Sequence, residues 1–129
     1  MPHPITPQHE VRYTKDKSWV RLEGESVVLG LSDYAAQMVK EFVFIKLPDK
    51  GQKLKKGDTY VSLESVKWSG HLASPVSGEV VAVNEQLFDE PSCINADPFG
   101  SWIAKVRMDN KDDLKGLMTR EQFEKWVKQ

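Results

Sequence analysis

The chain has 129 residues, a formal net charge of −1 and a single cysteine, with 40% hydrophobic and 29% charged residues. This length fits one domain with its own core, and the near-zero charge argues against a nucleic-acid or membrane partner. A single cysteine excludes an internal disulfide. The sequence contains neither an apolar run of about 18 residues nor the apolar segment of a signal peptide, so we expect a cytoplasmic protein.

The first third of the chain predicts an arm, a hairpin and a helix. Three prolines within residues 1–10 disfavour helix and sheet, so we assign these residues to a flexible arm and residues 11–129 to a single domain. Residues 19–22 and 27–31 flank a glycine-containing turn, which predicts a β-hairpin. Ser32 fits a helix N-cap. Apolar residues at helical spacing follow it and predict one buried helical face, formed by Ala35, Met38, Val39 and Phe42.

Later segments predict more strands and then a change to helix. Apolar runs and alternation bounded by turn residues predict strands at residues 42–47, 60–63, 78–84 and 102–108. Many short strands with few helices favour an all-β sandwich or barrel with helical additions.

The C-terminal segment predicts two short helices packed on the sheet. Asn110 is the predicted cap of the first, whose apolar residues are Leu114, Leu117 and Met118. Thr119 followed by Gln122 matches a capping box at the start of the second. The apolar face of that second helix is formed by Phe123, Trp126 and Val127.

The chain has only three histidines and one cysteine, which are scattered along the sequence. His3 and His9 lack a second cluster at metal-ligand spacing, and we interpret them as solvated. Cys93 has no neighbouring histidine, which favours a small apolar role over a reactive thiol. We find no pattern of nucleophile, base and orienting group, and no glycine-rich phosphate loop. The sequence therefore predicts no catalytic residue, no metal site and a protein that is not itself an enzyme.

Lys67 follows one predicted strand, at residues 60–63, and precedes another, at residues 78–84. Such a lysine is held at a rigid edge of the protein and faces solvent, which suits a residue that must enter the active sites of other proteins. A single lysine is otherwise most often an ordinary surface charge. Nearby, Glu64 and Asp58 either guide a modifying enzyme or are ordinary hairpin carboxylates.

Several short blocks, in this order and spacing, resemble the H-protein family of the glycine cleavage system. They are Tyr13-Thr14-Lys15, Trp19-Val20, Gly30-Leu31-Ser32-Asp33-Tyr34-Ala35, Val43-Phe44-Ile45-Lys46-Leu47-Pro48, Glu64-Ser65-Val66-Lys67, Pro75-Val76-Ser77-Gly78 and Ile94-Asn95-Ala96-Asp97-Pro98-Phe99-Gly100. The resemblance implies lipoic acid attached covalently to Lys67 in amide linkage. It also implies a flattened, barrel-like lipoyl/biotinyl domain (a barrel-sandwich hybrid) with an added early helix and short C-terminal helices.

The resemblance further implies a set of partners. A lipoate ligase or a lipoyl/octanoyl transferase would load Lys67. The arm would then serve a pyridoxal-phosphate-dependent glycine decarboxylase, a folate-dependent aminomethyltransferase and a flavin (FAD)-dependent lipoamide dehydrogenase. We expect the carrier to be a monomer, and its loaded arm to fold back against the protein surface.

The chain departs from the family beside the lysine, where Trp68 replaces the usual alanine. Trp68 either shelters the arm or packs on the hairpin. The departure favours an alternative partner, a heterodisulfide-reductase-like sulfur-oxidation complex for which the dithiol carries sulfur or electrons. A biotin carrier typically places its lysine between two methionines, whereas Val66 and Trp68 flank Lys67. A binding module that has lost modification also remains open.

Overall fold

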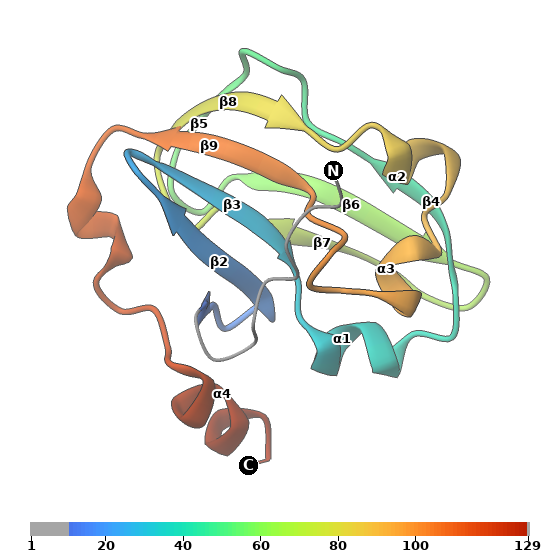
Figure 1. Ribbon diagram of the computed structural model, residues 1–129. Helices are drawn as coiled ribbons and strands as arrows, with labels where there is room; N and C mark the ends of the chain where they lie inside the picture. Colours follow the sequence, from blue (N-terminus) through green and yellow to red (C-terminus); the bar gives the residue numbers. More distant parts are fainter. Residues whose placement is uncertain (1–10, 129) are drawn as a thin grey trace.

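The computed structural model describes residues 11–128, and its strands form two sheets (Figure 1). One sheet has the order β1-β2-β3-β9-β8-β5 and the other the order β4-β6-β7. The strands are β1 (Arg12–Tyr13), β2 (Ser18–Glu23), β3 (Ser26–Leu31), β4 (Phe42–Lys46), β5 (Lys53–Leu54), β6 (Thr59–Ser65), β7 (Ser69–Ala73), β8 (Gly78–Val83) and β9 (Ala104–Met108). Every paired strand is antiparallel. The predicted mainly-β, flattened fold is confirmed, although the strands divide between two sheets and do not close into a barrel.

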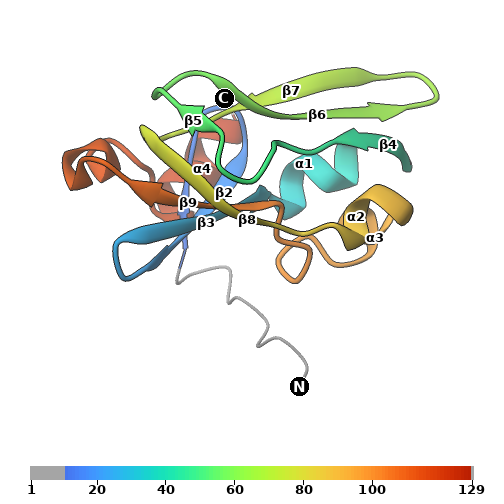
Figure 2. The same cartoon turned by 90° about the horizontal axis from the view of Figure 1, so that it is seen from above.

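The helices are short and lie at the ends of the sheets. They are α1 (Asp33–Met38), α2 (Gln86–Asp89), α3 (Cys93–Ala96), the 3-10 helix η1 (Lys111–Leu114) and α4 (Arg120–Val127). Seen from above, the β6–β7 hairpin forms one layer over the larger sheet, and α1, α2 and α3 gather toward its turn (Figure 2). The predicted early helix and C-terminal helices are therefore present. Within residues 11–128, no helix is long and apolar enough to cross a membrane.

The core lies between the two sheets. β1, β5 and β7 each contribute one buried residue, and every other strand contributes at least two. The helices α2 and α3 close one end of the core with Leu87 and Ile94. A second buried cluster packs α4 against the outer side of β1 and β2, with the ring of Tyr13 stacked on that of Phe123 at 4.4 Å between centroids. Burial on this scale is the main stabilising term for a chain of this length.

The N-terminal hairpin forms where the sequence predicts it. Glu23 pairs with Ser26 at the end of β2 and β3, and Gly24 in the turn has φ 64°, a conformation that glycine adopts without strain. Ser32 caps α1, because its hydroxyl accepts a hydrogen bond from the amide of Ala35 at 3.2 Å. The predicted arm at residues 1–10 lies outside the described residues.

The predicted helical face after Ser32 is wrong in its second half. The helix ends at Met38, whose side chain is 65% exposed, and Val39 is already extended. Phe42 is buried as the first residue of β4 and does not belong to the helix. The helix stops because tertiary hydrogen bonds from Asn95, described below, bind the backbone where another turn would form.

The first predicted C-terminal helix is shorter than expected. Asn110 caps η1, but the helix ends at Leu114, and Leu117 lies beyond it. Met118 forms an isolated antiparallel bridge with Tyr13, with backbone hydrogen bonds of 2.8 Å in both directions.

The second C-terminal helix starts as predicted. Its capping box is confirmed, with Thr119 and Gln122 exchanging side-chain-to-backbone hydrogen bonds. Arg120 then holds α4 against α1 through two hydrogen bonds to Asp33, of 2.7 and 3.0 Å.

Candidate functional site: a lysine at the turn of the β6–β7 hairpin

Lys67 lies at the exposed turn of the β6–β7 hairpin. β6 is anchored in the core because Val61 and Leu63 are buried on one face, as the alternation in the sequence predicts. The amide of Ser65 donates to the carbonyl of Trp68 at 2.7 Å, which leaves Val66 and Lys67 as the two central residues of the turn. Val66 is 86% exposed and Lys67 is exposed. The predicted presentation of the lysine at a rigid edge is therefore observed.

The strand that follows Lys67 differs from the prediction. The predicted strand at residues 78–84 is present as β8, which ends one residue earlier at Val83, but it belongs to the other sheet. The hairpin partner of β6 is β7, which pairs His71 with Ser62 and Gly70 with Leu63. Its single fully buried side chain is Leu72, so the apolar alternation that reveals most strands is missing. Because β7 follows β6 after a short turn, the lysine projects from that turn and does not lie in a long loop.

Trp68 packs back onto the hairpin. A Cβ at position 70 would lie 2.6 Å from two carbons of its indole, so the ring lies directly on Gly70. The indole also meets the ring of Phe42 edge-on, at 5.9 Å between centroids. Trp68 nevertheless stays 44% exposed. It therefore presents a fixed aromatic surface one residue from Lys67.

The opposite wall of the site is the short link between α1 and β4. Its position depends on Asn95 of α3, whose side-chain amide donates to the carbonyls of Ala36 and Val39 at 3.3 and 2.9 Å. The side-chain oxygen of Asn95 accepts from the amide of Phe42 at 2.9 Å. One side chain thus satisfies backbone groups at the end of the helix and at the start of the strand. The sequence blocks contain this asparagine, but nothing local to it signals the role.

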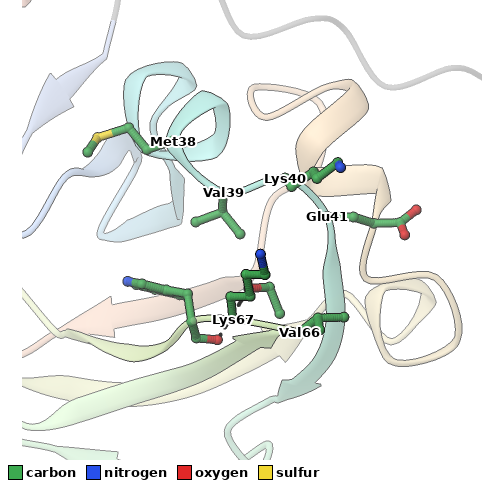
Figure 3. Close-up of a pocket in the computed structure, with 8 residues that line it drawn as sticks. Met38, Val39, Lys40, Glu41, Val66 and Lys67 are labelled. Atoms are coloured by element: carbon green, nitrogen blue, oxygen red, sulfur yellow. Dashed lines mark hydrogen bonds between the residues drawn. The ribbon is translucent and has the colours of Figure 1, made fainter.

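A pocket of about 700 Å³ separates this wall from the hairpin turn. Its lining residues are Met38, Val39, Lys40, Glu41, Ser65, Val66, Lys67 and Trp68. The amine of Lys67 points across it toward the link at Val39 and Lys40 (Figure 3). The pocket is mostly apolar, and its charged lining residues are Lys40, Glu41 and Lys67. It suits an alkyl chain that starts at the lysine.

The other residues singled out from the sequence lie away from the amine. Asp58 precedes β6, at the strand end opposite to the turn, and its carboxylate accepts from the amide of Lys55 at 2.9 Å. Glu64 is an exposed residue of β6 between Phe44 and Ser69 on the neighbouring strands. Asp58 is therefore a turn residue and does not reach Lys67.

Cys93 is only half-buried and donates its S–H to Glu90 at 3.4 Å. Partial burial and the adjacent carboxylate raise the pKa of this thiol above its ordinary value, which lowers the fraction present as thiolate. Its side chain packs against the main core, in line with the apolar role predicted. Among residues 11–128 no three His, Cys, Asp or Glu side chains gather closely enough to hold a metal ion.

A two-sheet β domain that presents a lysine at an exposed hairpin turn has the arrangement that a carrier of a covalently attached, swinging arm requires. The model of the glycine cleavage H-protein family matches residues 11–129. A glycine cleavage system H protein of Clostridium botulinum strain Okra is 42% identical over 113 residues, which cover 88% of this chain and 87% of that protein. One from Thermoanaerobacter sp. strain X514 is 41% identical over 115 residues, covering 89% and 91%.

The fold agrees with a solved structure. A crystal structure of a glycine cleavage system H protein from Mycobacterium marinum superposes with a TM-score of 0.84 at 26% identity, covering 94% of this chain and 98% of that one. The chain belongs to the glycine cleavage H-protein family. Proteins of this family carry lipoate attached covalently to a lysine, and this chain is a lipoyl carrier.

Proposed function

We propose that Lys67 is the lysine that bears the lipoate. The observation that carries the proposal is the exposure of Lys67 at the centre of a two-residue turn, on a hairpin anchored by buried Val61 and Leu63. A rigid base with an exposed tip lets a modifying enzyme reach the amine without unfolding the carrier. Lys40 is the other lysine that lines the pocket, but it belongs to the wall and not to the turn.

The surroundings of Lys67 fit the group. An amide bond removes the charge of the lysine, and the apolar side chains of Met38, Val39 and Trp68 line the pocket beside it. Bound lipoate supplies a dithiolane that can be reduced, can carry a small group and can be reoxidised. The protein itself contributes attachment, a defined position for the arm and a surface that partners recognise.

The partner set follows from membership of the family. We propose that a lipoate ligase or a lipoyl/octanoyl transferase modifies Lys67. The arm then carries the aminomethyl group of glycine from a glycine decarboxylase to an aminomethyltransferase, and a lipoamide dehydrogenase resets it. In this role the chain is a non-catalytic carrier. The proposal places residues 11–129 in one carrier domain.

Intact mass of the protein, co-expressed with a lipoylating enzyme, tests the attachment site. We expect one lipoyl addition on the wild-type chain, none on Lys67→Arg and one on the matched control Lys40→Arg. Peptide mapping should place the addition on Lys67. An addition that persists in Lys67→Arg, or that maps to another lysine, would overturn the assignment.

One observation favours a second function. Trp68 lies on Gly70 beside the arm, at the position where the family resemblance leads us to expect a small alanine. Trp68 suits a specialised branch in which the dithiol carries sulfur or electrons for a heterodisulfide-reductase-like complex. Glycine-dependent exchange of bicarbonate with a glycine decarboxylase separates the two. Fully lipoylated protein should support the exchange, whereas its failure to do so would favour the sulfur role.

A further inference from the structure

Exposed large apolar side chains gather at one end of the molecule. Seven such residues occur among those the structure describes, and six of them belong to the β6–β7 turn, the facing end of α1, β4 or α2. These six are Met38, Val43, Phe44, Val66, Trp68 and Phe88. The seventh, Leu22, lies near the end of β2, on the other side of the molecule from the β6–β7 turn (Figure 1). Exposed apolar residues that gather on neighbouring elements mark an interaction site more often than scattered apolar residues do.

Two of the six line a groove that is separate from the pocket at Lys67. The groove lies between β4 and α2, which are neighbours in both views of the fold (Figures 1 and 2). Phe44 of β4 is 45% exposed and Phe88 of α2 is 63% exposed. With Ile45, Leu47, Pro48 and Val83 they form the apolar part of a depression of about 490 Å³, here named the β4–α2 groove. Aromatic side chains left in water at this level are typical anchors of an interface.

The rim of the β4–α2 groove is acidic. Asp49, Glu85 and Asp89 line it, against a single cationic residue, Lys46. Throughout residues 11–128, none of these four side chains takes part in a salt bridge. Three carboxylates without cationic partners complement a surface that carries Arg or Lys beside an apolar side chain.

The groove is within reach of the arm. Phe44 pairs with Glu64, three residues before Lys67 on the same hairpin. At about 3.3 Å per residue of extended chain, Glu64 and Lys67 are at most roughly 10 Å apart. A protein seated in the groove therefore lies beside the hairpin turn that carries Lys67.

We propose that the β4–α2 groove is the surface on which the glycine decarboxylase docks, the enzyme that places the aminomethyl group on the lipoylated arm. The inference rests on the proposed function and adds the partner's place and chemistry. The partner inserts an apolar side chain between Phe44 and Phe88, and it sets Arg or Lys residues against Asp49, Glu85 and Asp89. Docking beside the turn leaves Lys67 free to move, so partner recognition and arm chemistry use different residues.

Steady-state kinetics with glycine decarboxylase, using lipoylated carrier as the varied substrate, tests the proposal. We expect the double variant Phe44→Gln/Phe88→Gln to raise KM for the carrier at least about tenfold while kcat changes less than about twofold, because two interface anchors are lost and the arm is intact. Leu22→Gln is the matched control, with KM unchanged. Intact mass and urea unfolding verify that all three proteins are lipoylated and folded.

A second variant tests the charges. Glu85→Gln/Asp89→Asn should lower kcat/KM about threefold to tenfold at low ionic strength, and the difference from wild type should shrink as salt is added. Unchanged KM in the aromatic double variant, with wild-type carrier active, would overturn the docking surface alone. Inactive wild-type carrier would overturn the proposed function and this inference together. A carrier that dimerises through Phe44 and Phe88 in sedimentation experiments would assign the groove to a second copy and also overturn the proposal.

Discussion

Gly70 and Trp68 should be energetically coupled. The coupling should be strong enough that Gly70→Ala lowers stability when Trp68 is present and raises it when Trp68 is absent. In Gly70→Ala the new Cβ would lie 2.6 Å from two indole carbons, closer than the 3.0 Å limit that real Cβ atoms respect. The three nearest heavy atoms all belong to Trp68, so the indole must move. We expect the displaced indole to lose its edge-on contact with Phe42, which now stands at 5.9 Å between centroids.

The size of the effect follows from two losses and one gain. The aromatic contact is worth about 1 kcal/mol. Trp68 is 44% exposed, and uncovering roughly 50 Å² more of its ring costs about 1.3 kcal/mol. Replacing glycine by alanine within a strand returns about 0.8 kcal/mol of chain entropy and packing. Gly70→Ala should therefore destabilise the wild-type fold by about 1.5 kcal/mol, but stabilise the Trp68→Ala variant by about 0.8 kcal/mol.

Urea unfolding of four proteins measures the coupling: wild type, the two single variants and the double variant. The expected coupling free energy is about 2.3 kcal/mol, the sum of the two losses. If Gly70→Ala changed the free energy of unfolding equally in wild type and in Trp68→Ala, the reasoning would be refuted. The packing of the indole would then not require a residue without a side chain at position 70. Fluorescence of Trp68 should also shift to the red in Gly70→Ala as the ring becomes wetter.

Two further predictions concern stability away from the arm. Burial raises the pKa of Tyr60 far above its ordinary value. Above about pH 10 the unfolded chain therefore releases a proton that the folded chain keeps. This group then lowers the free energy of unfolding by about 1.4 kcal/mol per pH unit. Tyr60→Phe should remove that slope in urea unfolding between pH 8 and 11. At neutral pH the substitution should cost about 1 kcal/mol of stability, because Ser18 loses its hydrogen-bond partner at 3.0 Å. Parallel curves of stability against pH for the two proteins would contradict this. Arg120→Met should cost about 2–3 kcal/mol, since it leaves the half-buried Asp33 without its two hydrogen bonds, whereas the exposed Arg107→Met should cost less than about 0.5 kcal/mol. Equal costs for the two arginines would show that the bond to Asp33 contributes little.

The sequence predicts those parts of the fold where local patterning and burial agree. β6 and β9 alternate apolar and polar residues, and both bury the face that the alternation indicates. Capping residues act only on the next few amides, so the starts of α1 and α4 follow from Ser32 and Thr119. Lys67 is indicated by the order of the family's sequence blocks, since nothing in its own side chain distinguishes it.

The missed features depend on contacts distant in sequence. β7 escapes notice because Gly70 is covered by Trp68 and so needs no apolar side chain of its own. The end of α1 is set by Asn95, which lies 53 to 59 residues from the backbone groups it binds. No local sequence pattern therefore predicts the position of the link between α1 and β4, which forms the pocket wall. Met38 shows the consequence, because its helical spacing predicts a core residue while its side chain is 65% exposed.

The three hydrogen bonds of Asn95 make the shape of the arm's pocket depend on one amide group. Spontaneous hydrolysis of that amide during ageing would replace a donor of two hydrogen bonds with a carboxylate that donates none. Two carbonyls at the end of α1 would then face a negative charge, and the wall would move away from the hairpin. Aged molecules of this carrier would keep Lys67 and the fold, but the pocket beside Lys67 would gradually lose its fixed width.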